Sequence, residues 1–355
     1  MIFRSRRRRR NPAVEASAGF APAERNGSGN VEELLAAIER LAAERRAARN
    51  PGLDSQLLAL RHRAGLALRA RTAGAAEHPP PDFEALGEDT GVPAVRGNEL
   101  SAEVLRAGIV RGGCLLVRGL VERGAAGSFR AEMERAFDAR EAVKAGEGQP
   151  DGYFQEFVPA PGYDLSDRFM VSDPNGMWVV DSPKVAGDWF ELLGGAGFLR
   201  VAEGYLGEHP AISVHKSTLR RVKADPNADY SLSHWHQDGA FMGQVRALNI
   251  WLSLSRCGDV APGLDLVPRR LDDIVPTGTE GAVFDWSVSQ KVAEESAGDA
   301  GVRRPIFEPG DALLFDDLFL HATGASPQMT ETRYAVECWF FAPSAFPAEY
   351  PPLAS

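Results

Sequence analysis

The sequence predicts an α+β protein in which the helices come first and the second half of the chain is mainly β. Residues 31–68 carry apolar side chains at helical spacing, whereas residues 211–341 contain short strand patterns separated by turn signals, with no helices alternating between them. That order favours a barrel or a sandwich for the second half. The length of 355 residues, of which 44% are hydrophobic and 25% charged, suits a soluble globular protein with one large domain or a domain and an appendage.

The first ten residues include six arginines, although the net charge of the chain is −10. Removing those six positive charges leaves −16 for the rest, and such an acidic body argues against a general nucleic-acid surface. Residues 1–30 are rich in Arg, Ala, Gly, Asn and Ser without periodicity, which predicts a disordered basic arm. No apolar stretch follows the arginines, so the arm does not resemble a secretory or twin-arginine leader.

The remaining composition favours a cytoplasmic protein. No uninterrupted apolar run is long enough for a transmembrane helix, so we expect no membrane span. The cysteines are odd in number, far apart and in no paired spacing, at Cys114, Cys257 and Cys338. We expect reduced, mostly buried thiols rather than a disulfide framework or a zinc knuckle.

A helical hairpin is predicted for residues 31–78. Asn30 followed by Glu33 resembles a capping box before a first amphipathic helix, a break at residues 50–52 ends that helix, and Asp54 can cap a second one. Two amphipathic helices joined by a tight turn form a hairpin. This hairpin is either a packing appendage or a docking element through which a homo-oligomer could form.

Three consecutive prolines after His78 form a stiff linker, which places the main domain at residues 79–355. The elements expected next are a helix from Leu100 to near Gly108, a buried strand at 113–121, a helix at 128–143 and helical periodicity at 189–206. Between the last two, residues 146–185 are rich in Gly, Pro, Asp and aromatic residues. Such a segment is either a lid over a substrate pocket or a packing loop.

The second half of the main domain supplies the strands and their turns. Strands are expected at 211–222, 248–254, 264–267, 312–315 and 333–341. A turn at residues 225–227 follows the first of them, and a Pro-Gly-Asp turn at 309–311 leads into the fourth.

One triplet in this half, His236-Gln237-Asp238, has the chemistry of a metal site. In an extended strand residues i and i+2 leave the same face, so His236 and Asp238 could grip one ion while Gln237 points the other way. His321, which directly follows the strand at 312–315 and its loop, is a candidate third ligand. Two histidines and one carboxylate on one side of a metal are the facial arrangement of non-haem Fe(II) oxygenases.

Arg333 begins the strand after His321. A planar guanidinium suits bidentate capture of a carboxylate. A cosubstrate that chelates a metal at one end and presents a second carboxylate at the other would need such a residue, and 2-oxoglutarate fits that description.

An ordered set of motifs resembles the phytanoyl-CoA hydroxylase-like family, and the match covers roughly residues 100–345. The set consists of Trp235-His236-Gln237-Asp238-Gly239, Asn249-Ile250-Trp251-Leu252-Ser253-Leu254, Pro309-Gly310-Asp311-Ala312-Leu313-Leu314-Phe315, His321 and Arg333. The resemblance implies a double-stranded β-helix (jelly-roll, cupin-like) core with flanking helices. It also implies a dioxygenase that uses Fe(II), 2-oxoglutarate and O2 and releases succinate and CO2. By the same resemblance His236, Asp238 and His321 would bind iron, Arg333 would hold the far carboxylate of 2-oxoglutarate, and Thr323 could add a hydroxyl there.

The chain also departs from the family pattern. Val267-Pro268-Arg269-Arg270 stands where many members carry Pro-Gly-Ser-His, and an insertion with glycines and acidic residues continues to Asp299. That departure puts any transfer of a substrate from relatives in doubt. Asp238 is present, whereas relatives that bind halide carry a small residue there, so hydroxylation or a related oxidation of a small organic substrate is favoured over halogenation.

Further candidates line the same strands. Asn249 could form a hydrogen bond in the cavity, and His215 or Lys216 could contact cosubstrate or substrate, while His234 shares a strand face with His236. Two other functions stay open: a cosubstrate-free cupin-like metal oxygenase or isomerase, against which Arg333 argues, and a catalytically silent jelly-roll binding protein.

Overall fold

The computed structural model describes residues 30–355 except 49, 72–76, 88–90, 149–150, 167, 169–175, 226–233 and 244. The predicted basic arm therefore lies outside the described residues but for Asn30, as do part of the aromatic segment at 146–185 and most of the expected turn at 225–227. The helices are α1 Val31–Ala47, α2 Pro51–Arg69, α3 Phe83–Leu86, α4 Ala102–Gly112, α5 Arg123–Lys144, α7 Pro183–Gly195, α8 Phe198–Leu206, α9 Gly239–Met242 and α10 Gln290–Ala297. Within the described part of the chain, no helix combines the length and the apolar character that crossing a membrane requires.

The strands form a large sheet and a small one. They are β1 Ala94–Arg96, β2 Cys114–Arg118, β3 Gly176–Trp178, β4 Ala211–Lys223, β5 Ala247–Ser253, β6 Gly263–Leu266, β7 Ala312–Phe315, β8 His321–Gly324, β9 Thr332–Phe341 and β10 Pro352–Ala354. The large sheet has the order β1-β2-β7-β5-β9-β4-β10, with β3 paired to β4, and the small sheet pairs β6 with β8. Neighbouring strands are antiparallel except β1 and β2, which are parallel.

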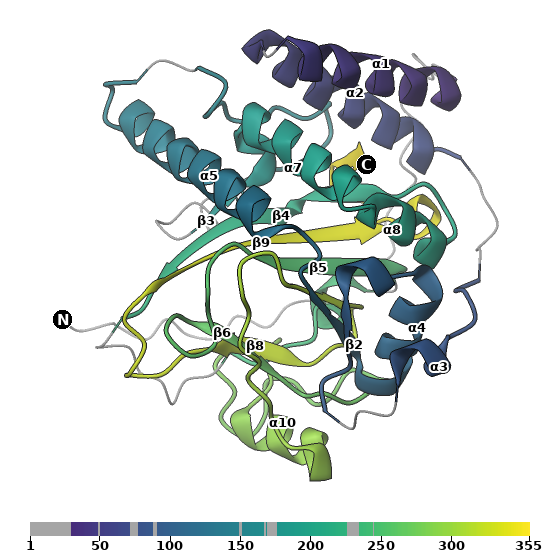
Figure 1. Cartoon of the computed structure of the whole chain (residues 1–355), viewed down its shortest axis with the longest axis vertical. Helices are drawn as coiled ribbons and strands as arrows, with labels where there is room; N and C mark the ends of the chain where they lie inside the picture. The colour runs from purple at the N-terminus through teal and green to yellow at the C-terminus, as the bar shows by residue number, and fades with distance from the viewer. Residues whose placement is uncertain are drawn as a thin grey trace, which may run out of the picture.

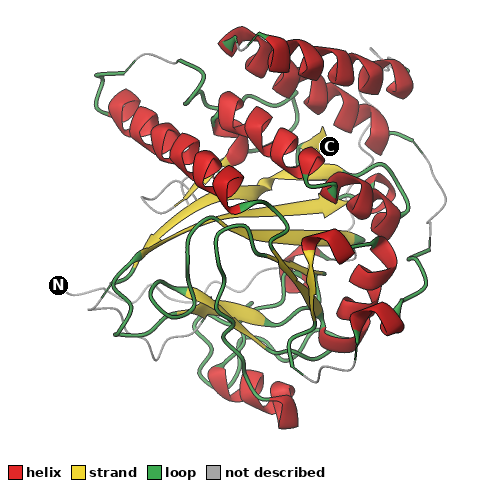
Figure 2. Ribbon diagram, viewed as in Figure 1, coloured by secondary structure: helices red, strands yellow, loops and turns green. Residues whose placement is uncertain are grey.

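The two faces of the large sheet bury different sets of side chains, because neighbours along a strand point to opposite faces. On β9, Val336 and Phe340 pack into the core beneath the helices, whereas Ala335 and Trp339 pack into a second core. That second core also contains Leu264 and other residues of the small sheet, so the two sheets pack face to face. Figures 1 and 2 show α5, α7 and α8 covering one side of the large sheet and β6 and β8 facing its other side. The predicted α+β class, with a mainly β core of jelly-roll type and flanking helices, is confirmed.

The N-terminal hairpin forms as predicted, but its second helix begins earlier than expected. Asn50, not Asp54, caps α2: its side chain accepts a hydrogen bond from the Gly52 N–H, and Pro51 occupies the first turn. The Asp54 carboxylate is buried instead against the guanidinium of Arg45. Arg45 also pairs with Asp188 of α7 at 2.7 Å, which joins the hairpin to the main domain.

The hairpin also contacts the end of the chain. Arg61 donates a hydrogen bond of 3.0 Å to the carbonyl of Ala354, and His62 Nδ1 donates one of 2.8 Å to the carbonyl of Pro352. The other ring nitrogen of His62 accepts a bond of 2.9 Å from the Ala160 N–H. α2 is thereby held against β10 and against the segment that follows α5.

Three further expectations need correction. α4 continues past Gly108 to Gly112 and is capped by Gly113 at a φ of 74°. Gly108 does not end the helix because its role is close packing: a Cβ there would lie 2.8 Å from Cβ of Leu115. The helical stretch at 189–206 is two helices, α7 and α8, because Gly197 adopts a φ of 73° between them. The segment at 146–185 contains β3, and the insertion before Asp299 contains α10.

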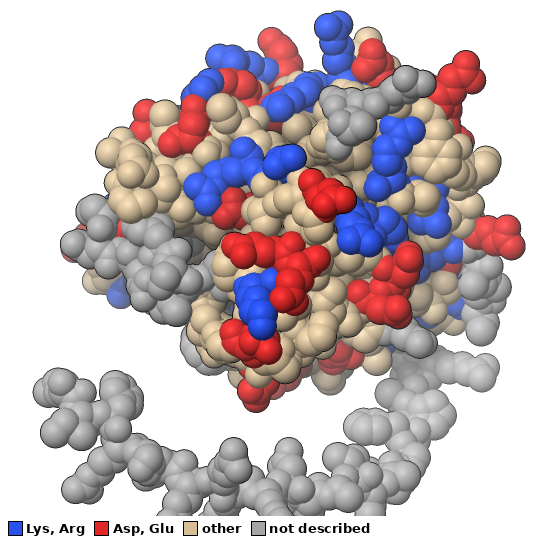
Figure 3. Space-filling model, turned by 90° about the horizontal axis from the view of Figure 1, so that it is seen from below, with Lys and Arg blue, Asp and Glu red and all other residues tan. Residues whose placement is uncertain are grey.

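The surface seen from the side of the small sheet carries both signs of charge. Lys and Arg side chains lie next to Asp and Glu side chains across this face (Figure 3). One such pair joins Lys291 of α10 to Glu280 at 3.1 Å. Exposed pairs of this kind contribute little to stability.

Candidate metal centre

The three predicted ligands meet between the two sheets. His236 and His321 form an antiparallel bridge in which each backbone N–H donates to the other's carbonyl, at 2.9 and 3.1 Å. The Nε2 atom of His321 lies 4.0 Å from Oδ2 of Asp238. One ligand atom from each of the three side chains lies within 4.8 Å of the other two. That cluster brings together residues 85 positions apart in the sequence.

Both histidines are oriented by their own backbone. Nδ1 of His236 donates to the carbonyl of His234 at 2.9 Å, and Nδ1 of His321 donates to the carbonyl of Phe319 at 3.1 Å. Each Nδ1 therefore carries the proton and each Nε2 keeps a free lone pair, as metal ligation requires. Burial lowers the pKa of His321 to about 4, and the neighbouring His236 adds to that shift. The His321 side chain is therefore uncharged at neutral pH and can offer its Nε2 lone pair to a metal ion.

The backbone positions the Asp238 carboxylate in a different way from the one predicted. Asp238 is not in an extended strand: it has helical dihedrals (φ −62°, ψ −26°) and directly precedes α9. The chain turns here because the Gly239 N–H donates to the carbonyl of Asp317 at 2.9 Å. The chain passes close to its neighbour here: a Cβ on Gly239 would lie 2.9 Å from a carboxylate oxygen and 3.1 Å from the carbonyl oxygen of Asp317. The turn, rather than strand alternation, brings the Asp238 side chain to the two histidines.

Gln237 points away from the ligands, as predicted, and anchors the triplet. It is fully buried, its amide NH2 donates to the carbonyls of Leu318 at 2.6 Å and Asp273 at 3.1 Å, and its Oε1 accepts from the Val275 N–H at 2.8 Å. These bonds tie the triplet both to the loop before His321 and to the insertion after β6. Such outer contacts fix the orientation of metal ligands.

The donor set fits a metal ion. Oδ2 of Asp238 is buried and has no hydrogen-bond partner among the described residues, and a buried carboxylate oxygen without a partner is costly unless an ion or ligand meets it. Two neutral imidazoles and one carboxylate on one side of a site are typical of non-haem iron. A metal bound by these three side chains would also satisfy the orphaned oxygen.

Two predicted residues, Asn249 and Arg333, lie on the inner face of the large sheet. Asn249 pairs in register with Phe315 and Trp339, which belong to the core between the sheets, and both polar atoms of its amide are buried without a partner among the described residues. Arg333 is buried on the same face and donates one bond of 3.0 Å to the Gly263 carbonyl, but its Nε has no partner and no described carboxylate forms an ion pair with it. Burial lowers the pKa of Arg333 to about 10.

The other predicted residues have different surroundings. Thr323 is exposed on β8. Lys216 places its Nζ 4.1 Å from the ring centroid of Phe241, and the His215 ring stacks on Trp178 at 5.2 Å. His234 is exposed, with its ring 5.5 Å from that of Phe284.

Two groups of residues near the triad escaped the sequence analysis. Glu337 alternates with Arg333 and Ala335 along β9, so it shares their inward face, and it pairs with Arg220 of β4 at 3.3 Å. The nearby Arg220 and His321 lower the pKa of Glu337 against the opposing effect of burial. Period-two alternation from Arg333 was the signal that could have found Glu337.

The second group is a set of partly exposed aromatic side chains around His236, namely Phe241, Phe284 and Trp286. Two of the three lie in the insertion that departs from the family pattern. Their sequence positions gave no periodic signal, because Phe241 lies in the four-residue helix α9 and the other two lie in an irregular loop.

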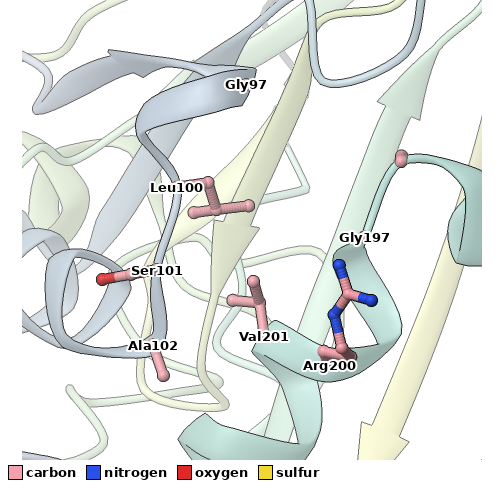
Figure 4. Close-up of a pocket in the computed structure, with 8 residues that line it drawn as sticks. Gly97, Leu100, Ser101, Ala102, Gly197, Arg200 and Val201 are labelled. Atoms are coloured by element: carbon pink, nitrogen blue, oxygen red, sulfur yellow. The ribbon is translucent and has the colours of Figure 1, made fainter.

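Another pocket lies away from the metal centre. It has a volume of about 340 Å³ and is lined by residues at the start of α4 and of α8, with the guanidinium of Arg200 on one side (Figure 4). None of the three metal ligands lines it.

No family model matches the sequence, and no curated protein matches it. Solved structures that share part of the architecture include EctD from S. alaskensis with bound Fe, which is 17% identical, with a TM-score of 0.45 over 77% of this chain and 86% of that one. AviO1 from Streptomyces viridochromogenes Tue57 is 17% identical, with a TM-score of 0.43 over 68% and 94%. The non-heme alpha ketoglutarate dependent epimerase SnoN from nogalamycin biosynthesis is 16% identical, with a TM-score of 0.42 over 67% and 80%. Likenesses this low do not assign a family or an activity, so the functional case depends on the geometry of the site.

Proposed function

We propose that the protein is an Fe(II)- and 2-oxoglutarate-dependent dioxygenase that oxidises a C–H bond of a small organic substrate. The observation that carries the proposal is the facial set of two Nε2 lone pairs and one unpartnered carboxylate oxygen, from His236, His321 and Asp238. The ordered motifs that resemble the phytanoyl-CoA hydroxylase-like family support the same assignment, and membership of that family is part of the proposal.

His236, Asp238 and His321 would hold the iron, and Arg333 with Asn249 would receive 2-oxoglutarate. Bound iron supplies the oxidising chemistry, which couples the conversion of 2-oxoglutarate and O2 to succinate and CO2 with oxidation of the substrate. The chain's own contribution is position: Gln237 fixes the ligand triplet, and the buried guanidinium of Arg333 offers a charged partner to the distal carboxylate. Thr323, two residues after His321 on β8, remains a candidate for a further hydroxyl contact with 2-oxoglutarate.

Two features bear on the alternatives. The buried Arg333, which forms no ion pair with a described carboxylate, argues against a cosubstrate-free metal oxygenase or isomerase, because such an enzyme binds no second carboxylate there. The buried Oδ2 of Asp238, which has no hydrogen-bond partner among the described residues, argues against a silent binding protein. The three cysteines are buried and unpaired, which fits the predicted cytoplasmic location.

Anaerobic titration of the metal-free protein with Fe(II) and then 2-oxoglutarate tests the proposal through the visible charge-transfer band of the chelate. We expect the band in the wild type and its loss in His236→Ala. Arg333→Ala should need about tenfold to a hundredfold more 2-oxoglutarate, because that change in affinity corresponds to the free energy of one charged hydrogen-bonded pair. Arg123→Ala, which removes an exposed arginine on α5, is the matched control and should titrate like the wild type.

Each other outcome selects an alternative. Iron binding without the band would favour the cosubstrate-free oxygenase or isomerase. Failure to bind iron at all would favour the silent binding protein.

A further inference from the structure

Three aromatic side chains form an exposed patch beside the metal ligands. Phe241, Phe284 and Trp286, which we call the aromatic rim, are 37%, 44% and 39% exposed. Phe284 stacks on Trp286 with ring centroids 5.0 Å apart, and Trp286 meets Phe241 edge to face at 5.7 Å. Isolated exposed aromatics are ordinary, whereas a contiguous exposed group favours a binding role.

The rim is continuous with the proposed iron site. The ring of His236 lies 6.4 Å from that of Phe241 and 5.9 Å from that of Trp286, measured between centroids. Phe241 belongs to α9, which starts directly after Asp238. A molecule covering the rim would therefore lie against a metal ligand.

The loop that carries the rim is held rigidly. Ser287 closes it with two bonds to Phe284, accepting from its N–H at 2.8 Å and donating its N–H to the Phe284 carbonyl at 3.0 Å. Val288 bridges to Trp235, the residue before His236, and the Trp235 indole donates to Gln290 at 2.7 Å. These bonds tie the loop that carries Phe284 and Trp286 to the residue next to His236, and such preorganisation reduces the ordering cost of binding.

A cation completes the surroundings of the rim. The Nζ of Lys216 lies 4.1 Å from the Phe241 ring centroid and forms no ion pair with a described carboxylate. Glu337, the carboxylate on the inward face of β9, pairs with Arg220 at 3.3 Å and interacts with Lys216 only through longer-range electrostatics. Lys216 can therefore meet an anionic group of a ligand that covers Phe241.

We propose that the substrate is a planar aromatic or fused-ring acid, whose rings contact the aromatic rim and whose acidic group contacts Lys216. This assignment depends on the proposed function, because it places the ring system next to the iron ligand His236. Aromatic side chains contact flat rings more favourably than saturated ones of the same size. The continuity with His236 favours the enzyme's own substrate over a protein partner.

The probe we would use is 2-naphthoate, compared with its fully saturated analogue decahydro-2-naphthoate and with the neutral 2-naphthamide. Affinities come from isothermal titration calorimetry of the protein loaded with Ni(II) and 2-oxoglutarate. We expect naphthoate to bind about tenfold or more tightly than the saturated acid, since each aromatic contact adds a few-fold to tenfold in affinity. Mn(II) in place of Ni(II) should broaden the naphthoate NMR signals, which locates the ligand beside the triad.

Substitutions test whether naphthoate binds at the aromatic rim rather than elsewhere on the surface. Phe284→Ala and Trp286→Ala should each weaken naphthoate binding about tenfold, and Trp286→Phe should restore most of it. Lys216→Met should remove the preference for naphthoate over naphthamide. Phe83→Ala is the matched control, because Phe83 is 41% exposed on α3 and belongs to no part of the rim.

Several results would overturn the assignment: no naphthoate binding, equal affinity for the saturated acid, unchanged binding in both rim alanine variants, or no broadening by Mn(II). A rim variant that changed the oligomeric state in light scattering without changing naphthoate affinity would show that the rim is instead an interface between two copies. The chelate band is measured in the same samples with Fe(II), so loss of the band is a failure of the proposed function, whereas loss of naphthoate binding alone is a failure of the substrate class.

Discussion

Gln237 gives the sharpest single test of how the metal site is built. Gln237→Met keeps the length of the side chain but removes its part-buried hydrogen bonds to the Leu318 and Asp273 carbonyls and to the Val275 N–H. A net value of about 1 kcal/mol for each bond gives a loss of about 3 kcal/mol in the free energy of unfolding. Because the same bonds orient the ligand triplet, metal affinity should also fall about tenfold to a hundredfold.

Two measurements on the same variant check this reasoning. Urea unfolding of the metal-free protein gives the stability loss, and titration with Fe(II) under anaerobic conditions gives the affinity. Gln155→Met is the control, since Gln155 is exposed and its amide has only a 3.4 Å contact with the Ser55 hydroxyl. If Gln237→Met unfolded within about 0.5 kcal/mol of the control, the range of a neutral surface substitution, Gln237 would not be the anchor described here.

Three other predictions concern the rest of the fold. Arg45→Met should lower the free energy of unfolding by about 3–5 kcal/mol in urea, because it leaves the buried carboxylate of Asp54 without its ion-pair partner and removes the pair to Asp188, which keeps Lys184; a loss below about 1 kcal/mol would contradict the role of Arg45 in joining the hairpin to α7. Burial raises the pKa of Asp181 to about 6, so its carboxyl is protonated more readily in the folded than in the unfolded chain, and stability should fall as pH rises from about 4 to 6. Asp181→Asn should remove that part of the pH dependence, and an unchanged profile would refute it. Thiol titration of the folded protein at neutral pH should find no reactive group before unfolding, because Cys114, Cys257 and Cys338 are fully buried and burial raises the pKa of each.

Sequence patterns predicted several strands well and picked out three residues that the structure brings together, because both depend on short-range regularities. The strand at 312–315 matches β7 residue for residue, and the strand at 333–341 matches β9 to within one residue. The order of His236, Asp238 and His321 was readable because each follows a recognisable turn or strand. Their meeting in space depends on the folded chain, in which His236 and His321 form an antiparallel bridge.

The features that the sequence did not predict depend on contacts between residues that lie far apart in the chain. Asp54 looked like a helix cap because its buried partner, Arg45, lies on the preceding helix and gains its other partners from α7. Gly108 looked like a helix end because nothing local reveals that Leu115 packs against it. The aromatic rim was invisible for the same reason, since Phe241 and Trp286 become neighbours only through the folded insertion.

The insertion after β6 therefore has two structural roles. Its backbone supports the metal site, because Asp273 and Val275 bond Gln237 and Val288 bridges to Trp235, on either side of His236. Its side chains Phe284 and Trp286 form most of the rim. A side-chain change in the rim can alter what binds without disturbing these backbone contacts, whereas a change in loop length would move both at once. We therefore expect substitutions in the rim to change ligand preference at constant iron affinity, and deletions within residues 276–286 to weaken iron binding as well.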